Sequence, residues 1–242
     1  MFHDYEKDDM QNMREIVTLW DVDGTLVKMW EVHYIAYEAT FRELYGIPGV
    51  DFREKYIAGK SPADIVRDVL KNRGKDDSFI EPKIHLVEPT IQKHYLPAIE
   101  KGKVEVLPGV VAILGALVKR NVTKGILSGN YLSTNEAILQ KTSLAKYFNF
   151  KITTSDSEDR KERMKKAIIF GERTVSGVLP RSDIYFFDDS LGGIQNSREF
   201  GIRHISVATG ATKYDELHAA KPYHVLKDLS DTQKVLRILG LE

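Results

Sequence analysis

The sequence predicts an α/β protein, with a parallel β-sheet flanked by helices and an all-helical subdomain inserted after the first strand. Short apolar runs rich in β-branched residues recur at 16–20, 122–127, 150–153, 184–187 and 202–207. Helical patterns separate the later runs. Strands that alternate with single helices are typical of βαβ units and a parallel sheet.

The first run, IVTLW at 16–20, stops at Asp21. A continuous apolar run favours a strand buried on both faces, as in a parallel sheet, over a strand with one wet face. The later runs have the same character. The helical patterns between and after them cover residues 109–120, 133–141, 160–170 and 192–200.

Residues 28–104 interrupt this alternation. They show helical patterns over 31–45, 61–72 and 83–100 and no convincing strand. We interpret them as an inserted helical subdomain with stems at 26–29 and 104–108, which leaves 1–27 and 105–242 as the α/β core. Residues 1–15 are polar and are expected to form a loosely docked arm. The alternative is one α/β domain with a long crossover, and connections of that length usually carry function.

Composition narrows the functional class. The chain has 242 residues, 35 Lys and Arg against 35 Asp and Glu, no cysteine and 42% hydrophobic residues. Without cysteine there is no disulfide framework, Cys-ligated zinc or thiol nucleophile. The balanced charge argues against a nucleic-acid partner. No apolar run approaches the ~20 residues of a membrane span, and the charged start is unlike a signal peptide. We therefore expect a soluble cytoplasmic protein without a membrane or nucleic-acid partner; its oligomeric state is left open.

Two acidic pairs follow two of the predicted strands. Asp21 and Asp23, in DVDGT at 21–25, end the first, and Asp188 and Asp189 end the run at 184–187. In open α/β sheets, ligands bind outside the carboxyl ends of the strands. Carboxylates this close repel one another unless a cation lies between them, and Mg²⁺ accepts one or two carboxylates together with phosphate oxygens. We expect both pairs to converge on one Mg²⁺ site.

Two further segments are weaker signals. Ser128-Gly129-Asn130 follows a strand and offers hydroxyl and backbone N–H donors for an anion, although such a sequence is also an ordinary helix cap or turn. The segment SDSEDRK at 155–161 opens a helix and carries Arg160 and Lys161. Either cation could face a bound phosphate, and spacing does not choose between them.

Taken in order, these features resemble the haloacid dehalogenase superfamily of phosphohydrolases. The resemblance rests on DVDGT at 21–25, Ser128, a basic residue near 160 and FFDDS at 186–190, and it covers residues 16–240. It implies a Rossmann-like core with 28–104 as the helical cap. The segments VATG and DLSD, at 207–210 and 228–231, are similar to phosphoglycolate-phosphatase-like members. The segment DDSLGGI at 188–194 is similar to the β-phosphoglucomutase-like branch.

The resemblance implies a role for each acidic residue. Asp21 would be the nucleophile that forms an aspartyl-phosphate. Asp23 would protonate the leaving oxygen and then activate water. The carboxylates of Asp21 and Asp189 and the backbone carbonyl of Asp23 would bind Mg²⁺, and Asp188 would hold a metal-bound water or support that shell.

The resemblance also implies phosphate-binding residues. Ser128 and Arg160 would bind the transferring phosphoryl oxygens, helped by backbone N–H groups near Gly24 and Gly129. Arg160 is favoured over Lys161 because Ser-Asp-x-x-x-Arg recurs in the phosphatase-like members. One departure concerns the fourth motif, where the commoner pattern has glycine at the place of Asp188 and aspartate at the place of Gly193.

Substrate choice is expected to come from the cap. Lys60 lies in a short loop before a helix, where the family often reaches its substrate; the alternative is a solvated loop lysine. Trp30 and Tyr34 are assigned to packing near the first stem. Six histidines show no ligand spacing and receive no role: His33, His85, His94, His204, His218 and His224.

The resulting prediction is a Mg²⁺-dependent phosphatase that hydrolyses a small phosphorylated metabolite, either phosphoglycolate-like or a sugar phosphate. One alternative is a sugar-phosphate mutase of the β-phosphoglucomutase type, suggested by DDSLGGI. The other is a module that binds a phosphorylated ligand without turnover. The presence of both Asp21 and Asp23 argues against that module. Asp23 also argues against dehalogenation, because a halide leaving group needs no acid.

Overall fold

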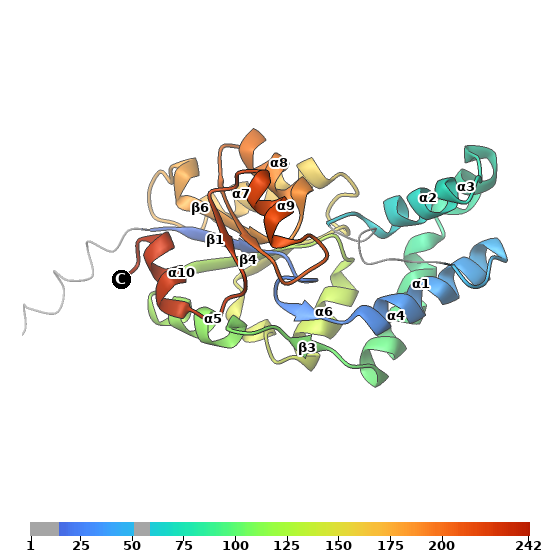
Figure 1. The fold of residues 1–242 in the computed structure, drawn as a ribbon, viewed down its shortest axis with the longest axis horizontal. Coiled ribbons are helices and arrows are strands. Elements are labelled where there is room, and N and C mark those ends of the chain that lie inside the picture. The colour runs from blue at the N-terminus through green and yellow to red at the C-terminus, as the bar shows by residue number, and fades with distance from the viewer. Residues whose placement is uncertain (1–14, 51–58) are drawn as a thin grey trace, which may run out of the picture.

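The computed structural model describes residues 15–50 and 59–242. Its main sheet has six parallel strands in the order β5-β4-β1-β6-β7-β8 (Figure 1). The predicted parallel α/β sheet is confirmed. Its strands are β1 (Val17–Trp20), β4 (Thr123–Leu127), β5 (Phe150–Ile152), β6 (Ile184–Asp188), β7 (Arg203–Val207) and β8 (His224–Leu226).

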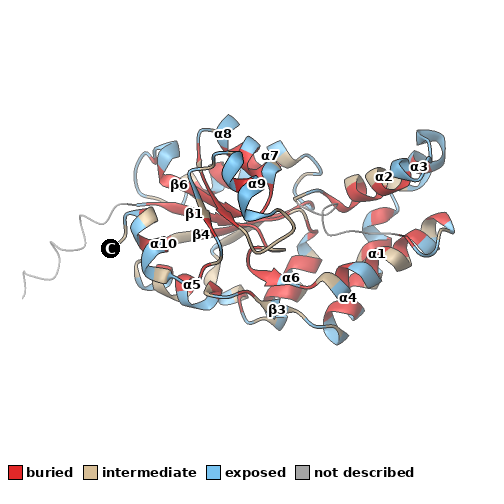
Figure 2. Cartoon of the chain, viewed as in Figure 1, coloured by how far each residue is buried: buried red, intermediate tan, exposed pale blue. Residues whose placement is uncertain are grey.

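Helices cover both faces of this sheet, and Figure 2 shows the strands buried between them. They are α5 (Val110–Lys119), α6 (Leu132–Lys141), α7 (Arg160–Glu172), α8 (Leu191–Glu199), α9 (Tyr214–Ala219) and α10 (Thr232–Leu239). The predicted helical patterns match α5 to α8 closely. The sequence pattern did not identify β8, α9 or α10.

Strand β1 lies at the centre of the sheet, between β4 and β6. Alternate side chains of a strand point to opposite faces. Val17 and Leu19 accordingly pack in the core on the α7 side, whereas Trp20 belongs to the core on the other side. Trp20 stacks on Phe187 of β6, with ring centroids 3.9 Å apart. This packing fixes the register that brings the ends of β1 and β6 together.

The segment between the first and second strands of the main sheet forms a helical block beyond one end of the sheet (Figure 1). Its described helices are α1 (Trp30–Tyr45), α2 (Pro62–Asn72), α3 (Asp77–Ile84) and α4 (Val87–Lys101). The two predicted stems contain β2 (Val27–Lys28) and β3 (Glu105–Val106), which pair antiparallel. The division into two domains stays a prediction. The predicted N-terminal arm lies almost entirely outside the described residues, as do residues 51–58 of the insert.

One helix prediction in the insert is wrong. A single helix was expected over 83–100, but the chain forms α3 and α4 with a break at His85 and Leu86. Pro89 lies in the first turn of α4 and has no N–H to donate to the carbonyl of His85, so the helical ladder is interrupted there. Helix α3 also begins earlier than expected because the Asp76 side chain caps it, accepting a hydrogen bond from the Phe79 N–H at 3.0 Å.

Helices α1 and α4 pack against each other along a buried apolar face. Val32, Ala36 and Phe41 of α1 share one core with Ile91 and other residues of α4. The same pair of helices also carries buried polar side chains, among them His33 and Tyr95. The helical block therefore brings aromatic and hydrogen-bonding groups to the edge of the sheet where the acidic residues lie.

Candidate active site

Asp21 is the first residue after β1. Its N–H donates to the Phe187 carbonyl of β6 at 2.9 Å, which ties the end of β1 to its neighbour. The chain then turns sharply, because the N–H groups of Leu26 and Val27 both donate to the Val22 carbonyl. This turn presents Asp21 and Asp23 at the carboxyl edge of the sheet. Asp21 is buried, whereas the Asp23 side chain is 21% exposed.

Gly24 does not have the predicted role of phosphate donor. Its N–H donates to the Val27 carbonyl at 2.9 Å and is therefore not free. The glycine is required for space and conformation instead. Its φ is +77°, and an added Cβ would lie 2.7 Å from Oδ2 of Asp189. A side chain at this position would push Asp189 out of the site.

Asp188 and Asp189 follow from the parallel pairing of β1 and β6. Trp20 pairs with Phe187, so the residues after both strands meet at the same edge. Asp21, Asp188 and Asp189 are all buried, and each offers an oxygen such that these oxygens lie within 4.8 Å of one another. Three of the four acidic side chains therefore converge as expected, whereas the Asp23 carboxylate is not part of this cluster.

The site strongly disfavours a full set of ionised carboxylates. Burial, followed by the charges of Asp188, Asp189 and Asp23, raises the pKa of Asp21 well above its usual value. Burial and the charge of Asp188 likewise raise the pKa of Asp189. A cation between these side chains would remove the cause of both shifts.

The donor set fits a hard divalent cation. Oδ1 of Asp188 and Oδ1 of Asp189 are buried without a hydrogen-bond partner. Their other oxygens are occupied: Ser190 Oγ donates to Oδ2 of Asp188 at 2.6 Å, and the Ala211 N–H donates to Oδ2 of Asp189 at 3.2 Å. Buried polar atoms without a hydrogen-bond partner need an explanation. A bound Mg²⁺ would provide one, because this ion prefers carboxylate oxygens as ligands.

The structure also explains why adjacent acids are tolerated here. An added Cβ on Gly193 would lie 1.7 Å from Oδ2 of Asp188. The Asp188 carboxylate thus occupies space that a side chain at position 193 would need. The departure from the commoner motif is a matched exchange, in which the acid at 188 depends on glycine at 193.

The Ser128-Gly129 segment faces the same carboxylates. The Ser128 N–H donates to the Ile152 carbonyl at 3.1 Å, and Ser128 Oγ accepts from the Asn130 N–H at 3.1 Å. The hydroxyl proton of Ser128 is left to donate elsewhere. Ser128 and Gly129 line a small pocket together with Asp21, Asp188 and Arg160.

Arg160 and Lys161 point to different surroundings. Nη2 of Arg160 donates to Ser190 Oγ at 2.8 Å and lies 3.5 Å from Oδ2 of Asp188. Lys161 instead pairs with Glu199, and both of these side chains are more than half exposed. Arg160 therefore lies at the candidate site, and Lys161 lies on the surface of α7.

Lys60 lies where the helical block touches the core. It forms an ion pair with Asp68 of α2, and its backbone rests against Gly129. An added Cβ on Gly129 would lie 2.3 Å from the Lys60 carbonyl oxygen, and one on the neighbouring Gly59 would lie 2.5 Å from the Arg160 guanidinium. Lys60 thus borders the site, with its charge shared with Asp68.

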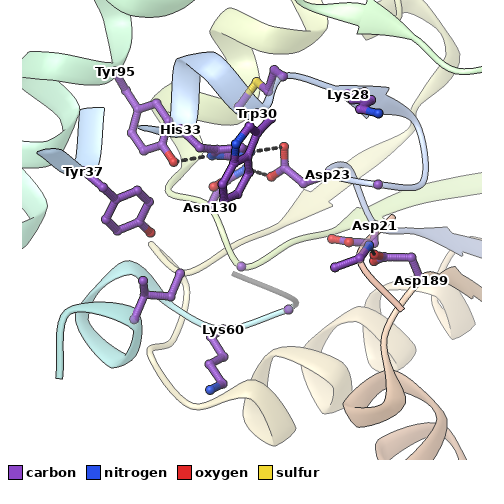
Figure 3. Close-up of a pocket in the computed structure, with 16 residues that line it drawn as sticks. Asp21, Asp23, Lys28, Trp30, His33, Tyr37, Lys60, Tyr95, Asn130 and Asp189 are labelled. Atoms are coloured by element: carbon purple, nitrogen blue, oxygen red, sulfur yellow. Dashed lines mark hydrogen bonds and ion pairs between the residues drawn. The ribbon is translucent and has the colours of Figure 1, made fainter. Parts of the chain in front are cut away.

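His33 has a contact that sequence reasoning missed. Its Nε2 lies 2.9 Å from Oδ1 of Asp23, and its Nδ1 lies 2.5 Å from the Tyr95 hydroxyl (Figure 3). Asn130 Nδ2 donates to the other oxygen of Asp23 at 2.5 Å. No sequence spacing distinguishes His33 from the other histidines, because Tyr95 is 62 positions away and Asn130 comes from the core. The absence of a predicted role for His33 is corrected accordingly.

These groups surround one pocket between the sheet edge and the helical block (Figure 3). Trp30 packs against the core, as predicted, and also lines this pocket. Tyr34 does not pack as predicted, since it is 42% exposed. The pocket is lined by the carboxylates Asp21, Asp23 and Asp189, by Lys28 and Lys60, by His33, Asn130 and Trp30, and by Tyr37 and Tyr95, among others.

A sequence profile of the haloacid dehalogenase-like hydrolases matches residues 18–207, which include every acidic residue of the site. The chain belongs to this family. The predicted family is thereby confirmed, and the matched range includes the helical block between β2 and β3.

Two relatives illustrate the branch of this hydrolase. The chain is 23% identical over 188 residues to the phosphoglycolate phosphatase of Escherichia coli K12, and this match covers 78% of the chain and 68% of that enzyme. It is 25% identical over 210 residues to the protein CbbY of Rhodobacter capsulatus, covering 84% and 89%. The chain spans about two thirds of the length of the phosphoglycolate phosphatases it matches.

Solved structures share the fold of this hydrolase. CbbY from Rhodobacter sphaeroides in complex with phosphate has a TM-score of 0.74 at 18% identity, covering 90% of this chain and 96% of that one. β-Phosphoglucomutase from Clostridium difficile also has a TM-score of 0.74, at 16% identity, covering 94% and 98%. Both branches named by the sequence resemblance are therefore represented. Among the described residues, no helix combines the length and the apolar character needed to cross a bilayer.

Proposed function

We propose that this hydrolase is a Mg²⁺-dependent phosphatase that acts on a small phosphorylated metabolite through an aspartyl-phosphate at Asp21. The observation that carries this proposal is the buried cluster of Asp21, Asp188 and Asp189 next to Ser128 and Arg160. Phosphoryl transfer requires positive charge and hydrogen-bond donors around the phosphate. The carboxylate cluster can hold a cation that supplies the charge, and the Ser128 hydroxyl and the Arg160 guanidinium supply the donors.

Mg²⁺ would be held by the carboxylates of Asp21 and Asp189 and the backbone carbonyl of Asp23, with Asp188 bound through water or supporting the site. When bound, the ion supplies positive charge that lowers the repulsion between the phosphate and an anionic nucleophile. Two unpartnered carboxylate oxygens, one on Asp188 and one on Asp189, support this assignment.

Asp21 would attack phosphorus. A bond forms between its carboxylate oxygen and phosphorus, and the bond between phosphorus and the leaving oxygen breaks. Asp23 donates its proton to that oxygen, so the product leaves as an alcohol. In the second half-reaction Asp23 takes a proton from water, the water oxygen bonds to phosphorus, and Asp21 is released with inorganic phosphate. Asp23 lines the pocket beside Asp21 and is the less buried of the two, as an acid that exchanges protons with a ligand requires.

The phosphoryl oxygens would be bound by the hydroxyl of Ser128, the N–H of Gly129 and the guanidinium of Arg160. All three residues line the same small pocket as Asp21. Arg160 is held by Ser190 and Asp188 at 2.8 and 3.5 Å, so its position is set before a ligand arrives. A positioned cation costs little reorganisation during the reaction.

Lys60 and the residues of the larger pocket would contact the remainder of the substrate. Lys28 also lines this pocket and forms no ion pair among the described residues; its cross-strand neighbour Glu105 pairs with Lys103 at 2.9 Å instead. Two lysines at a pocket of limited size suit a phosphoglycolate-like or sugar-phosphate substrate. The similarity to phosphoglycolate phosphatase and CbbY supports the same class.

The first test measures phosphate release with and without Mg²⁺ across phosphoglycolate, sugar phosphates, nucleotides and pyrophosphate. We expect one substrate class to dominate in kcat/KM, and both Asp21→Asn and a chelator to abolish the release. The matched control is Asp215→Asn, which removes one carboxylate from the exposed surface of α9. Normal turnover by a verified Asp21→Asn preparation would rule out the aspartyl-phosphate mechanism.

A sugar-phosphate mutase is the second candidate. The DDSLGGI segment and the fold shared with β-phosphoglucomutase support it. A mutase would convert one sugar-phosphate isomer to another, need a bisphosphate activator and conserve total ester phosphate. Net phosphate release without an isomerised product would exclude it. Ligand retention without any turnover would instead indicate a binding module.

A further inference from the structure

Five polar side chains form a continuous line along the wall of the larger pocket. Tyr37 hydrogen-bonds to Tyr95, the Tyr95 hydroxyl lies 2.5 Å from Nδ1 of His33, and Nε2 of His33 lies 2.9 Å from Asp23. Asn130 Nδ2 reaches the second oxygen of Asp23 at 2.5 Å. Two of these residues come from α1, one from α4 and two from loops of the core (Figure 3).

The direction of each hydrogen bond follows from the carboxylate at the end of the line. An ionised Asp23 only accepts, so Asn130 and His33 must both donate to it. A neutral histidine that donates from Nε2 has a bare Nδ1, which must accept from Tyr95. The buried tyrosines retain their protons, because burial raises the pKa of Tyr37 and Tyr95 well above the usual value. In this tautomer Tyr95 therefore donates its single hydroxyl proton to Nδ1 of His33.

We propose that Tyr95 is a positioning residue for Asp23 and acts through His33. This inference rests on the proposed function, in which Asp23 is the acid and base. The Asp23 carboxylate favours the His33 tautomer that donates from Nε2, the Tyr95 hydroxyl holds the His33 ring through Nδ1, and His33 together with Asn130 fixes the direction of the carboxyl group. Tyr95 itself touches neither the reacting atoms nor Asp23 in this arrangement.

The same two donors remain in place when Asp23 is protonated. Each carboxyl oxygen has two lone pairs, so Asp23 can accept from His33 and Asn130 and still carry a proton on a lone pair that faces the pocket. Without the Tyr95 hydroxyl, Nδ1 of His33 loses the donor that holds the ring in this orientation. Because the His33 side chain is 4% exposed, water does not replace that donor, and the ring can turn Nε2 away from Asp23.

The hydrogen bonds through His33 also connect the helical block to the core. Tyr95 and His33 belong to the helical block, whereas Asp23 and Asn130 belong to the core. The bond between His33 and Asp23 is therefore a link between the two parts of the molecule. The His33 bond to Asp23 exists only while the helical block lies against the sheet as it does here, whereas the Asn130 bond is made within the core.

The test uses the dependence of rate on the leaving group. Breaking the ester bond of an alkyl phosphate needs an acid, whereas the leaving oxygen of 4-nitrophenyl phosphate is stabilised without one. We expect Tyr95→Phe to lower kcat/KM, which reports the steps up to departure of the leaving group, about 10-fold on phosphoglycolate and less than about 2-fold on 4-nitrophenyl phosphate, since one positioning hydrogen bond is lost. Tyr45→Phe is the matched control. It removes another buried hydroxyl of the helical block, which donates to the Ile80 carbonyl at 3.1 Å and does not line the pocket.

Equal losses on the two esters would make Tyr95 a merely structural residue, and unchanged rates on both would also overturn the inference. Asp23→Asn separates this failure from that of the proposed function. It is expected to lose about 10²- to 10⁴-fold in kcat/KM on the alkyl ester and much less on the aryl ester. Hydrolysis of the aspartyl-phosphate is common to both esters and does not enter kcat/KM. Equal losses of kcat/KM in Asp23→Asn would therefore mean that Asp23 is not the acid, whereas equal losses in Tyr95→Phe alone would overturn only the inference.

A measurement on the unchanged protein covers the case in which Tyr95→Phe does not fold. The ¹⁵N shifts of the His33 ring are expected to show a protonated Nε2 and a bare Nδ1. A proton on Nδ1, alone or together with one on Nε2, would contradict the direction derived for the line.

Discussion

Asp189→Asn is expected to stabilise the metal-free protein while removing its response to Mg²⁺. The Asp189 carboxylate is buried with those of Asp21 and Asp188, and oxygens of all three lie within 4.8 Å of one another. Asparagine keeps the shape and can still accept the hydrogen bond from the Ala211 N–H. Its amide can donate towards the neighbouring carboxylates, where Oδ1 of Asp189 has no partner.

The magnitude follows from the spacing of the charges. Two unit charges separated by 4.8 Å repel by about 3 kcal/mol at an effective dielectric constant of about 20. Asp189 faces two such charges, so removing its charge should stabilise the metal-free fold by at least about 3 kcal/mol at a pH where the cluster is ionised. For a chain of this size, 1 kcal/mol corresponds to about 2–4 °C in Tm.

The pH dependence has a definite sign. Burial and neighbouring charges raise the pKa of Asp21 and Asp189 in the folded state. Between the unfolded pKa near 4 and these raised values the folded protein binds more protons, so the stability of the metal-free protein falls as pH increases. The advantage of Asp189→Asn should be small near pH 4 and grow towards pH 8.

The assay is thermal and urea unfolding in a chelator and in saturating Mg²⁺, at several pH values, for the wild type, Asp189→Asn and the surface control Asp215→Asn. A ligand at 100 times its Kd adds about 2.7 kcal/mol. We expect Mg²⁺ to stabilise the wild type and the control, and not Asp189→Asn. The reasoning is refuted if Asp189→Asn is less stable than the wild type in chelator at pH 8, or if Mg²⁺ stabilises both equally.

Three other predictions follow from single contacts. Arg160→Met should lower kcat/KM by more than about 100-fold in a steady-state assay, whereas Lys161→Met should leave it within about 2-fold, because Lys161 pairs only with the exposed Glu199. Gly129→Ala should raise KM and lower kcat/KM, since the added Cβ would lie 2.3 Å from the carbonyl oxygen of Lys60. The control is Gly115→Ala, whose added Cβ has no atom within 4 Å, and equal effects of the two variants would contradict a role for the Gly129–Lys60 contact. Burial lowers the pKa of His204 to about 4, so the wild type should lose about 3 kcal/mol of stability as pH falls from about 6.5 to 4. His204→Gln should reduce this loss, and a pH profile of the urea midpoint identical to that of the wild type would count against the prediction.

Much of the core was predictable because its signals are local. A short apolar run such as 184–187 favours a strand with both faces covered, and the acids that follow it are then expected at a strand end. The break between α3 and α4 also has a local cause, Pro89, but the apolar periodicity continues across the break and favours a single helix. The hydrogen bond that occupies the Gly24 N–H could not be predicted from local sequence, because it depends on how tightly the chain turns after β1.

By itself, the sequence determined the parallel α/β core, the helical insert and the placement of Asp21, Asp23, Asp188 and Asp189 at strand ends. These follow from residue patterns within about ten positions, where backbone geometry fixes which side chains share a face.

Only the tertiary structure decided which groups surround those acids. It placed Arg160 rather than Lys161 at the site, since one residue along a helix turns the side chain by about 100°. It also brought His33 to Asp23 and Tyr95 to His33. Such contacts join elements that are distant in sequence, and they depend on how α1 and α4 pack on each other and against the sheet edge. No local pattern encodes that geometry, because it is settled by the complementary shapes of whole helices and strands.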